Sequence, residues 1–414
     1  FRKAALETGQ ARIQRLTDNL NRVTREHLIG LRVVRAYNAD QYQQEKFEQA
    51  NVELTNTNLF ANRLMTMIGP GMTFIMSGLS VSIYWIGAYL INGAAVPDRI
   101  TLFSNMVVFS SYAMQVVMAF MMVSMIFILM PRASISAKRI MEVLNTESSI
   151  VNGHETTGEE SVMGQVEFRN VSFKYPDAEE AVLRNISFTA KRGETVAFIG
   201  ATGSGKTSVI NLIPRFYDVT EGEVLVDGVN VRDYNQQSLH NKIGYVPQRA
   251  VLFNGTVVSN VSYGDNGRAG ASEKLVKDAV SIAQGTEFVE KMDGQYQGRI
   301  SQGGANVSGG QKQRLSIARA IYRQPEIYIF DDSFSALDYR TDRILRSALK
   351  KETGHATTLI VGQRIGTIKD ADRIIVLDQG EIVGSGTHEE LMTNCSTYQE
   401  IAYSQLSKEE LIHG

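Results

Sequence analysis

The chain has 414 residues and a formal net charge of −2, from 42 Lys and Arg against 44 Asp and Glu, and it contains one cysteine, Cys395. This length allows two or three domains with large cores, and the near-neutral charge gives no electrostatic reason to expect a nucleic-acid partner. A single cysteine excludes an internal disulfide and is compatible with a reducing compartment.

Residues 1–62 are polar, rich in Arg and Gln, and free of proline. Their apolar residues follow a broken helical period, which predicts a long cytoplasmic helical excursion with a break near Gly30. A plain solvated surface helix is the alternative. Because the helical pattern is already under way at Phe1, the sequence also predicts a fragment of a longer polypeptide.

Two long stretches, residues 64–97 and 100–131, contain no Asp, Glu, Lys or Arg. A membrane-spanning helix needs about 20 apolar residues, so each stretch is long enough to cross a bilayer. The sequence therefore predicts transmembrane helices at about 60–92 and 101–130. Gly69-Pro70-Gly71 is expected to kink the first of them.

The basic residues that flank these stretches predict their orientation. Arg63 precedes the first, Lys138 and Arg139 follow the second together with Arg132, and the short loop Asn92–Arg99 is neutral. Positive-inside bias places both outer flanks in the cytoplasm and the loop outside. Whatever follows residue 140 is then cytoplasmic, in a multi-pass protein of the cell membrane.

Residues 145–163 are polar and contain Gly153 and Gly158, as is typical of a linker. The remaining chain, 164–414, alternates short apolar runs with helical stretches. This pattern predicts an α/β domain with a largely parallel central sheet. The runs expected to form strands are Gln165–Phe173, Thr195–Ile199, Glu223–Val226, Ile243–Val246, Ile327–Phe330, Thr358–Val361 and Arg373–Leu377.

A phosphate-binding loop follows the second of these runs, with the pattern Gly200-x-x-x-x-Gly205-Lys206-Thr207. Its glycines let backbone N–H groups point at phosphate oxygens, and the following helix directs its positive end there. Lys206 is expected to reach the β- and γ-phosphates of ATP, and the Thr207 hydroxyl to bind Mg²⁺. The predicted ATP-binding residues of this loop are Gly200, Ala201, Thr202, Gly203, Ser204, Gly205, Lys206, Thr207 and Ser208.

Two further signals lie later in the chain. The strand Ile327–Phe330 ends in Asp331, a carboxylate placed to hold Mg²⁺ through water beside a phosphate loop. A second helix N-terminus able to bind phosphate lies between the phosphate loop and Asp331. It is formed by Ser308, Gly309, Gly310 and Gln311.

Together these motifs resemble the ATP-binding-cassette (ABC) family, and the resemblance extends over essentially the whole chain. It implies that Tyr175 stacks on adenine, with a plain surface tyrosine as the alternative, and that Gln248 belongs to the loop that touches Mg²⁺ and faces the membrane domain. Ser335–Asp338 matches the D-loop, and the segment Glu26–Asp40 resembles the intracellular helices of ABC exporters.

On that resemblance the chain is an ABC exporter half: the C-terminal part of a helical membrane domain over 1–144, then the linker, then an α/β cassette over 164–414. Residues 1–58 would form the intracellular coupling region, with a coupling helix around Gln14–Asn21. The two predicted spans would be the last two of six, the earlier ones lying outside this sequence.

Two positions depart from the family pattern. Asp332 stands where active cassettes carry a water-activating glutamate, and Gln363 stands where they carry the switch histidine. The shorter Asp332 side chain displaces its carboxylate, and a displacement of about 1 Å can cost about 10²-fold in rate. The amide of Gln363 can donate a hydrogen bond to the γ-phosphate but cannot become cationic. Gln302-Gly303-Gly304 also departs from the glutamate-containing stretch usual in exporters.

These departures, beside an intact Ser308–Gly310 signature, predict the degenerate half of a heterodimeric exporter, with Asp332 and Gln363 as its weak catalytic residues. An enzyme that tolerates both changes is the alternative, as in a homodimer with two slow sites that exports lipid or peptide. The expected cargo is a small amphiphilic compound, and the expected partners are a second half-transporter and membrane lipid. A non-transport ATP-binding regulator and an importer are less consistent with the fused membrane spans.

Overall fold

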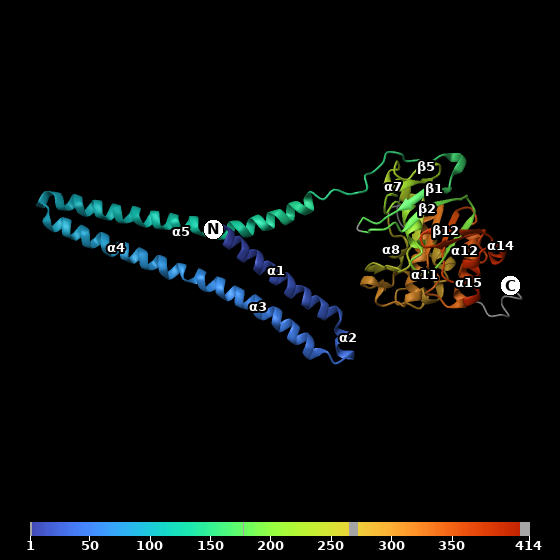
Figure 1. Cartoon of the computed structure of the whole chain (residues 1–414), viewed down its shortest axis with the longest axis horizontal. Helices are drawn as coiled ribbons and strands as arrows, with labels where there is room; N and C mark the ends of the chain where they lie inside the picture. The colour runs from blue at the N-terminus through green and yellow to red at the C-terminus, as the bar shows by residue number, and fades with distance from the viewer. Residues whose placement is uncertain (1, 177, 265–271, 406–414) are drawn as a thin grey trace. The chain divides into compact units, whose positions relative to one another are not determined.

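The computed structural model describes residues 2–176, 178–264 and 272–405 (Figure 1). It divides into two compact units, Phe1–Glu147 and Ser148–Gly414. The first unit is entirely helical in its described part, and the second contains all the strands.

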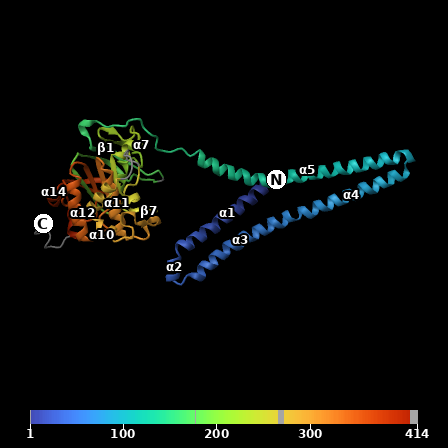
Figure 2. The same cartoon turned by 180° about the vertical axis from the view of Figure 1, so that it is seen from behind.

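The described part of the first unit contains five α-helices, and the four long ones lie side by side in two pairs. α1 packs along α3 and α4 packs along α5, as the views from the front and from behind both show (Figures 1 and 2). The helices are α1 Arg2–Ile29, α2 Leu31–Ala36, α3 Asp40–Thr66, α4 Ile68–Gly93 and α5 Arg99–Leu144.

The turn between α1 and α3 lies where the sequence predicted a break, at Gly30, and contains the short helix α2. Asn38, with φ of 52°, reverses the chain before α3 begins at Asp40. Residues Gln14–Asn21, expected to form a coupling helix, are helical, and that role stays a prediction. These residues form the middle of the 28-residue helix α1, which no proline interrupts, whereas the short helix at the turn is α2.

Two segments of this unit are long and apolar enough to cross a membrane. They lie within Asp40–Gly93, which contains an 18-residue window of mean hydropathy 1.6, and within Val96–Phe127, which contains one of mean hydropathy 1.8. The first segment is interrupted at Met67, between α3 and α4, slightly before the kink expected at Gly69–Gly71. The reason is that Pro70 has no N–H to donate to the Thr66 carbonyl, so the helix breaks within the preceding turn.

The second unit contains two main sheets. The first has the strand order β2-β1-β4-β5 and is antiparallel. The second has the order β12-β11-β3-β10-β9-β6, in which all neighbours are parallel except β12. The strands are β1 Val166–Phe173, β2 Leu183–Ala190, β3 Thr195–Ile199, β4 Glu221–Val226, β5 Val229–Asn230, β6 Ile243–Val246, β7 Gly255–Thr256, β8 Arg299–Ile300, β9 Ile327–Asp331, β10 Thr357–Val361, β11 Arg373–Asp378 and β12 Glu381–Gly386.

Helices connect these strands and cover the parallel sheet. They are α6 Lys206–Leu212, α7 Gln236–Asn241, α8 Val257–Val261, α9 Glu273–Ile282, α10 Thr286–Glu290, α11 Gly309–Arg323, α12 Tyr339–Glu352, α13 Ile365–Ile368, α14 His388–Asn394 and α15 Ser396–Gln405. The alternation of strands and helices predicted for this domain is therefore present.

The parallel sheet is buried on both faces, and successive residues of one strand enter different cores. In β3, Val196 and Phe198 pack with the antiparallel sheet and α6. Ala197 and Ile199 pack with α9, α11 and α15 on the opposite face. Side chains of a strand alternate between faces, so a doubly covered strand must be apolar throughout. That is why these strands were visible as continuous apolar runs.

Most of the stretch interpreted as a linker packs with the second unit. The backbone N–H of Gly153 donates to Tyr234 O at 3.0 Å, and that of Glu159 donates to Asp227 O at 2.9 Å. Residues from Ser148 onward therefore belong structurally to this unit, which starts before the predicted residue 164.

A buried ionic cluster joins this segment to the sheets. Asp227 is 1% exposed, and its carboxylate accepts from the Gly164 N–H at 2.6 Å and pairs with Lys242 Nζ at 2.7 Å. Lys242 also pairs with Glu326 at 3.0 Å. Burial by itself lowers the pKa of Lys242, but the interactions of its ammonium with the Asp227 and Glu326 carboxylates outweigh burial and leave that pKa raised.

We predict that Lys242→Met destabilises the second unit by about 3 kcal/mol, because it leaves the Asp227 carboxylate buried without its cation. The measurement is the midpoint of thermal unfolding of the purified chain in detergent. Lys291→Met is the matched control, since Lys291 pairs with Glu287 at 2.6 Å on the exposed surface and such a pair is worth about 0–1 kcal/mol. Equal midpoints for the two variants would contradict the prediction.

Candidate nucleotide-binding site

The candidate site lies where four parallel strands end at one edge of the sheet. Val361 of β10 is paired with Asp331 of β9 and with Phe198 of β3, and Val246 of β6 is paired with Phe330. The loops after these strands therefore start side by side. They carry the phosphate loop, Gln248, Asp332 and Gln363, which are spread along the chain from residue 200 to residue 363.

The phosphate loop passes so close to neighbouring backbone that its first glycine has no room for a side chain. Gly200 has φ of 156°, and a Cβ there would lie 2.0 Å from the Leu377 carbonyl oxygen. Gly205 has φ of 97°, and a Cβ there would meet Leu183 Cδ2 at 2.5 Å. The loop then enters α6 at Lys206, so the N-terminus of that helix faces the loop.

Lys206 is buried at the centre of this loop. Its ammonium donates to the carbonyl oxygens of Gly200 and Ala201, both at 2.8 Å. Burial lowers the pKa of Lys206, and the nearby charges of Asp332 and Asp331 oppose that shift. The side chain is thus held inside the curl of the loop by these two carbonyl oxygens.

Thr207 and Asp331 form a pair of oxygen donors beside this lysine. The Thr207 hydroxyl donates to Asp331 Oδ1 at 3.0 Å, and Asp331 is buried. Burial raises the pKa of Asp331, while the hydrogen bond from Thr207 lowers it. Hydroxyl and carboxylate oxygens are the ligands that Mg²⁺ prefers.

One carboxylate oxygen of Asp332 accepts hydrogen bonds from two side-chain amides. Gln363 Nε2 donates to Asp332 Oδ2 at 2.9 Å, and Gln248 Nε2 donates to it at 3.3 Å. The Asp332 backbone has φ of 43°, a left-handed conformation that Asp tolerates better than most residues. Burial raises the pKa of Asp332, against the effect of the hydrogen bond from Gln248.

Tyr175 lies near the loop, at its helical end. Its hydroxyl is 3.0 Å from the Ser208 hydroxyl, and its ring packs edge-on against Phe173 and Tyr217 at centroid distances of 4.8 and 5.1 Å. The side chain is therefore half-buried and fixed within an aromatic cluster, and it is not a freely exposed surface tyrosine.

The signature group lies apart from these residues. Ser308 caps α11 by accepting from the Gln311 N–H at 3.3 Å, while Gln311 Oε1 accepts from the Ser308 N–H at 2.9 Å. α11 packs against α8, α9 and β6, and among the described residues no hydrogen bond joins Ser308–Gln311 to the phosphate loop. Gly309 has open space around it.

Two residues that sequence reasoning missed support these loops. Gln313, buried in α11, donates to the Pro247 carbonyl at 3.2 Å, next to Gln248. Gln405, in α15, donates to the Gln363 carbonyl at 2.7 Å. Both contacts join segments dozens of residues apart. Gln313 follows Ser308–Gln311 in the same stretch, but nothing in that stretch indicated its partner, and Gln405 belongs to no motif.

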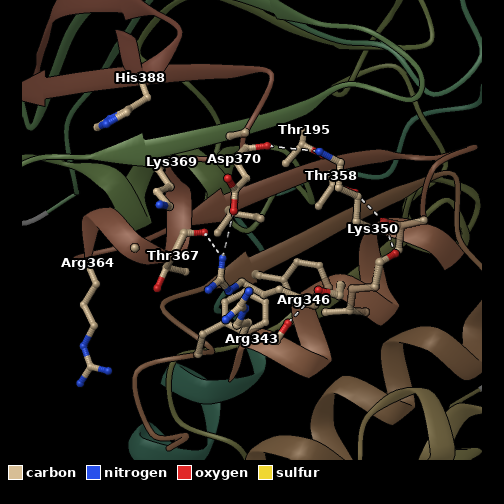
Figure 3. A pocket seen from close by; sticks show the side chains of 18 of the residues that line it. Thr195, Arg343, Arg346, Lys350, Thr358, Arg364, Thr367, Lys369, Asp370 and His388 are labelled. Atoms are coloured by element: carbon tan, nitrogen blue, oxygen red, sulfur yellow. Dashed lines mark hydrogen bonds and ion pairs between the residues drawn. The ribbon is translucent and has the colours of Figure 1, made fainter. Parts of the chain in front are cut away.

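A cavity of about 1040 Å³ lies behind the Gln363 loop and is lined by α12, α13 and Gln405 (Figure 3). Its labelled side chains are mostly basic. The Arg346 guanidinium points to the Thr367 carbonyl at 3.4 Å and to Asp370 at 3.9 Å. None of the predicted ATP-binding residues lines it, so this cavity is distinct from the phosphate loop.

Comparison with known proteins identifies the class. A family model described as ABC transporter matches residues 183–335, and one described as ABC transporter transmembrane region matches residues 4–120. The chain belongs to the ABC transporter family. It is an exporter half-transporter with membrane helices and a cytoplasmic ATP-binding domain, an ATPase coupled to transport.

Individual relatives agree with this assignment. An uncharacterized ABC transporter ATP-binding protein of Mycobacterium tuberculosis H37Rv is 44% identical over 95% of this chain and 67% of its own length. An ATP-dependent lipid A-core flippase of Syntrophus aciditrophicus is 33% identical over 97% of this chain and 65% of its own length. The solved structure of a bacterial Atm1-family ABC exporter with ATP bound is also similar. The match covers 98% of this chain and 72% of the exporter chain, with 27% identity and a TM-score of 0.80. A regulator without a membrane domain and an importer are both inconsistent with these similarities.

We predict that Gly200→Ala lowers both the thermal midpoint and nucleotide affinity, because the new Cβ must displace the Leu377 backbone. Gly203→Ala is the control: Gly203 has φ of 88°, but a Cβ there meets no atom within 4 Å. The control should cost only the left-handed backbone term of about 1–2 kcal/mol. Thermal unfolding and titration with a fluorescent ATP analogue measure both effects. A larger loss in Gly203→Ala would show that the contact with Leu377 does not determine the loop.

Proposed function

We propose that this chain is the half of a heterodimeric exporter that binds ATP at a weak site of its own and completes the strong site of its partner. Members of this family that carry one cassette per chain typically work as dimers. The observation that carries the proposal is the pairing of Asp332 with Gln248 and Gln363 on a single carboxylate oxygen.

The phosphate loop fits a nucleoside triphosphate. The close approach at Gly200 leaves a backbone cradle that a side chain would fill, and Lys206 supplies a cation within it. Thr207 and Asp331 offer oxygen donors suited to Mg²⁺, which when bound neutralises charge on the β- and γ-phosphates. Tyr175, fixed beside Ser208, offers a ring for adenine.

The weak water-activating end follows from the chemistry of Asp332. A base for water must lie within hydrogen-bond reach of the attacking water to accept its proton. In this chain both amide donors engage Asp332 Oδ2, on a side chain one methylene shorter than glutamate. Gln363 itself cannot supply a positive charge to the γ-phosphate. Binding elements are therefore complete, while the elements that speed hydrolysis are reduced.

The signature group, Ser308–Gly310, is intact, in contrast to the water-activating residues. Ser308, Gly309 and Gly310 are intact, lie at an open helix N-terminus, and are separate from the chain's own phosphate loop. A helix N-terminus with open glycines suits a phosphate brought by another molecule. We assign this group to the ATP site of a partner cassette, in the head-to-tail arrangement that the family resemblance implies.

The proposed cargo is a small amphiphilic compound. Eleven of the fifteen methionines lie between Met65 and Met130, and methionine adapts to irregular apolar ligands, although it also packs in ordinary helices. Relatives named lipid A-core flippases favour an amphiphile of lipid type. A homodimeric lipid or peptide exporter with two slow sites is the second candidate, and the same relatives support it.

The two candidates differ in which mutation stops ATP hydrolysis. In the heterodimer, Asp332→Asn should leave most activity of the complex, because little passes through this site. Ser308→Arg should reduce it by about 10²–10³-fold, since it blocks the partner's γ-phosphate and removes a preorganised donor. The measurement is the ATPase rate of the complex purified from its native membrane through a tag on this chain.

A homodimer predicts instead that Asp332→Asn is inactive and that no second chain copurifies. The reverse ranking of the two variants would therefore overturn the degenerate-half proposal. Asp332→Glu combined with Gln363→His serves as the gain-of-function control, with increased hydrolysis expected from this chain's own site.

The proposed membrane topology is a two-span hairpin with its loop outside. In a Cys395→Ser background, Asn92→Cys or Ala95→Cys should react with an impermeant thiol reagent added to intact cells. Asn56→Cys and Ser136→Cys should react only after permeabilisation. Labelling of Asn56→Cys or Ser136→Cys in sealed cells would contradict the proposed orientation.

A further inference from the structure

Gln405, in the last turn of α15, holds the backbone of the Gln363 loop at two points. Its side-chain Nε2 donates to the Gln363 carbonyl at 2.7 Å, and its Oε1 accepts from the Ile365 N–H at 2.9 Å. One amide thus bridges the backbone on both sides of Arg364. A glutamine side chain can do this because it carries a donor and an acceptor on one planar amide group.

The Ile365 N–H is a donor that needs such a partner. Ile365 is the first residue of α13, and its N-cap residue Arg364 makes no side-chain capping bond. Helix N-termini leave backbone N–H groups unsatisfied, and Ile365 is fully buried, so an unpaired group there would be costly. Gln405 supplies from a distant helix the cap that the local sequence lacks.

The same loop carries a site residue on its other side. The Gln363 side chain donates to Asp332 Oδ2 at 2.9 Å, while its carbonyl accepts from Gln405. The preceding Gly362 N–H donates to Phe198 O of β3 at 3.1 Å. The position of the Gln363 amide is therefore set by β3 before it and by Gln405 after it.

The helix that carries Gln405 is firmly anchored. Tyr398 and Ala402 of α15 are fully buried in the core on that face of the sheet. The Tyr398 hydroxyl is 2.7 Å from His388 Nδ1. By contrast, the loop itself borders the 1040 Å³ cavity of Figure 3, which is lined by Arg364, Gly366 and Thr367 as well as Gln405. Packing does not fix the loop on that side, so the hydrogen bonds do.

We propose that Gln405 is a positioning residue for the γ-phosphate of ATP: it holds the loop so that the Gln363 amide stays directed into the nucleotide site. This inference rests on the proposed function, in which Gln363 donates to the γ-phosphate. A positioning role of this kind affects ATP, which has a γ-phosphate, and spares ADP, which lacks it. A general loss of folding affects both nucleotides equally.

The test compares the affinities of the full chain, in detergent, for Mg²⁺ with a non-hydrolysable ATP analogue and for Mg²⁺ with ADP. Gln405→Ala should weaken the ATP analogue about five- to tenfold, the equivalent of one hydrogen bond, and leave ADP unchanged. Gln405→Glu, which keeps the acceptor for Ile365 but sets a carboxylate oxygen against the Gln363 carbonyl, should weaken it at least as much.

Gln399→Ala is the matched control. Gln399 is a glutamine of the same helix whose Nε2 donates to two backbone carbonyls, of Met392 at 2.8 Å and Thr393 at 3.4 Å, and to none in the loop. It should leave the ATP-to-ADP affinity ratio unchanged. Gln363→Ala should give the same ATP-specific loss as Gln405→Ala, and the double variant should lose no more than either alone.

Lys206→Ala separates failure of this inference from failure of the proposed function. If Lys206→Ala leaves both affinities unchanged, the assignment of the nucleotide site is wrong. If Lys206→Ala weakens binding but Gln405→Ala changes ATP and ADP equally, or neither, only the role of Gln405 is overturned. Additive losses in the Gln363→Ala, Gln405→Ala double variant would overturn it as well.

Discussion

The nucleotide site depends on the register between two central strands, β9 and β10. Asp331 at the end of β9 is paired with Val361 at the end of β10. This register lets Asp331 meet Thr207 and lets Asp332 meet Gln363. A slip of one residue would exchange the faces of every side chain in the strand. The large rings of Tyr328 and Phe330 on one face, and isoleucines on the other, make that exchange costly.

Much of this arrangement could be predicted from the sequence because its determinants are local. Strands buried on both faces appear as continuous apolar runs, and the Gly200–Thr207 pattern specifies a backbone path almost without reference to the rest of the chain. The helices of the first unit were harder. The sequence predicted the break near Gly30, but not that a short helix, α2, and a reversal at Asn38 would form the turn.

Tertiary contacts account for what the sequence did not reveal. Gln313 and Gln405 look like ordinary polar residues of amphipathic helices, and glutamine is common on such surfaces. Their importance comes from the carbonyl groups that the fold brings to them, those of Pro247 and Gln363. No periodicity or spacing in the chain records these pairings. The segment at 153–159 was missed for the same reason, since its backbone bonds to Asp227 and Tyr234 arise only after folding.

The interruption at Met67 has a mechanical consequence for the first unit. An unbroken helix of 54 residues would resist bending along its whole length, because every turn is closed by hydrogen bonds. Here Pro70 has no N–H to form one of those hydrogen bonds, so bending of the helix is concentrated within a single turn. α3 can then change its tilt while α4 keeps its own. Bending is therefore absorbed at one joint, near the start of the apolar segment, and is not spread through the span.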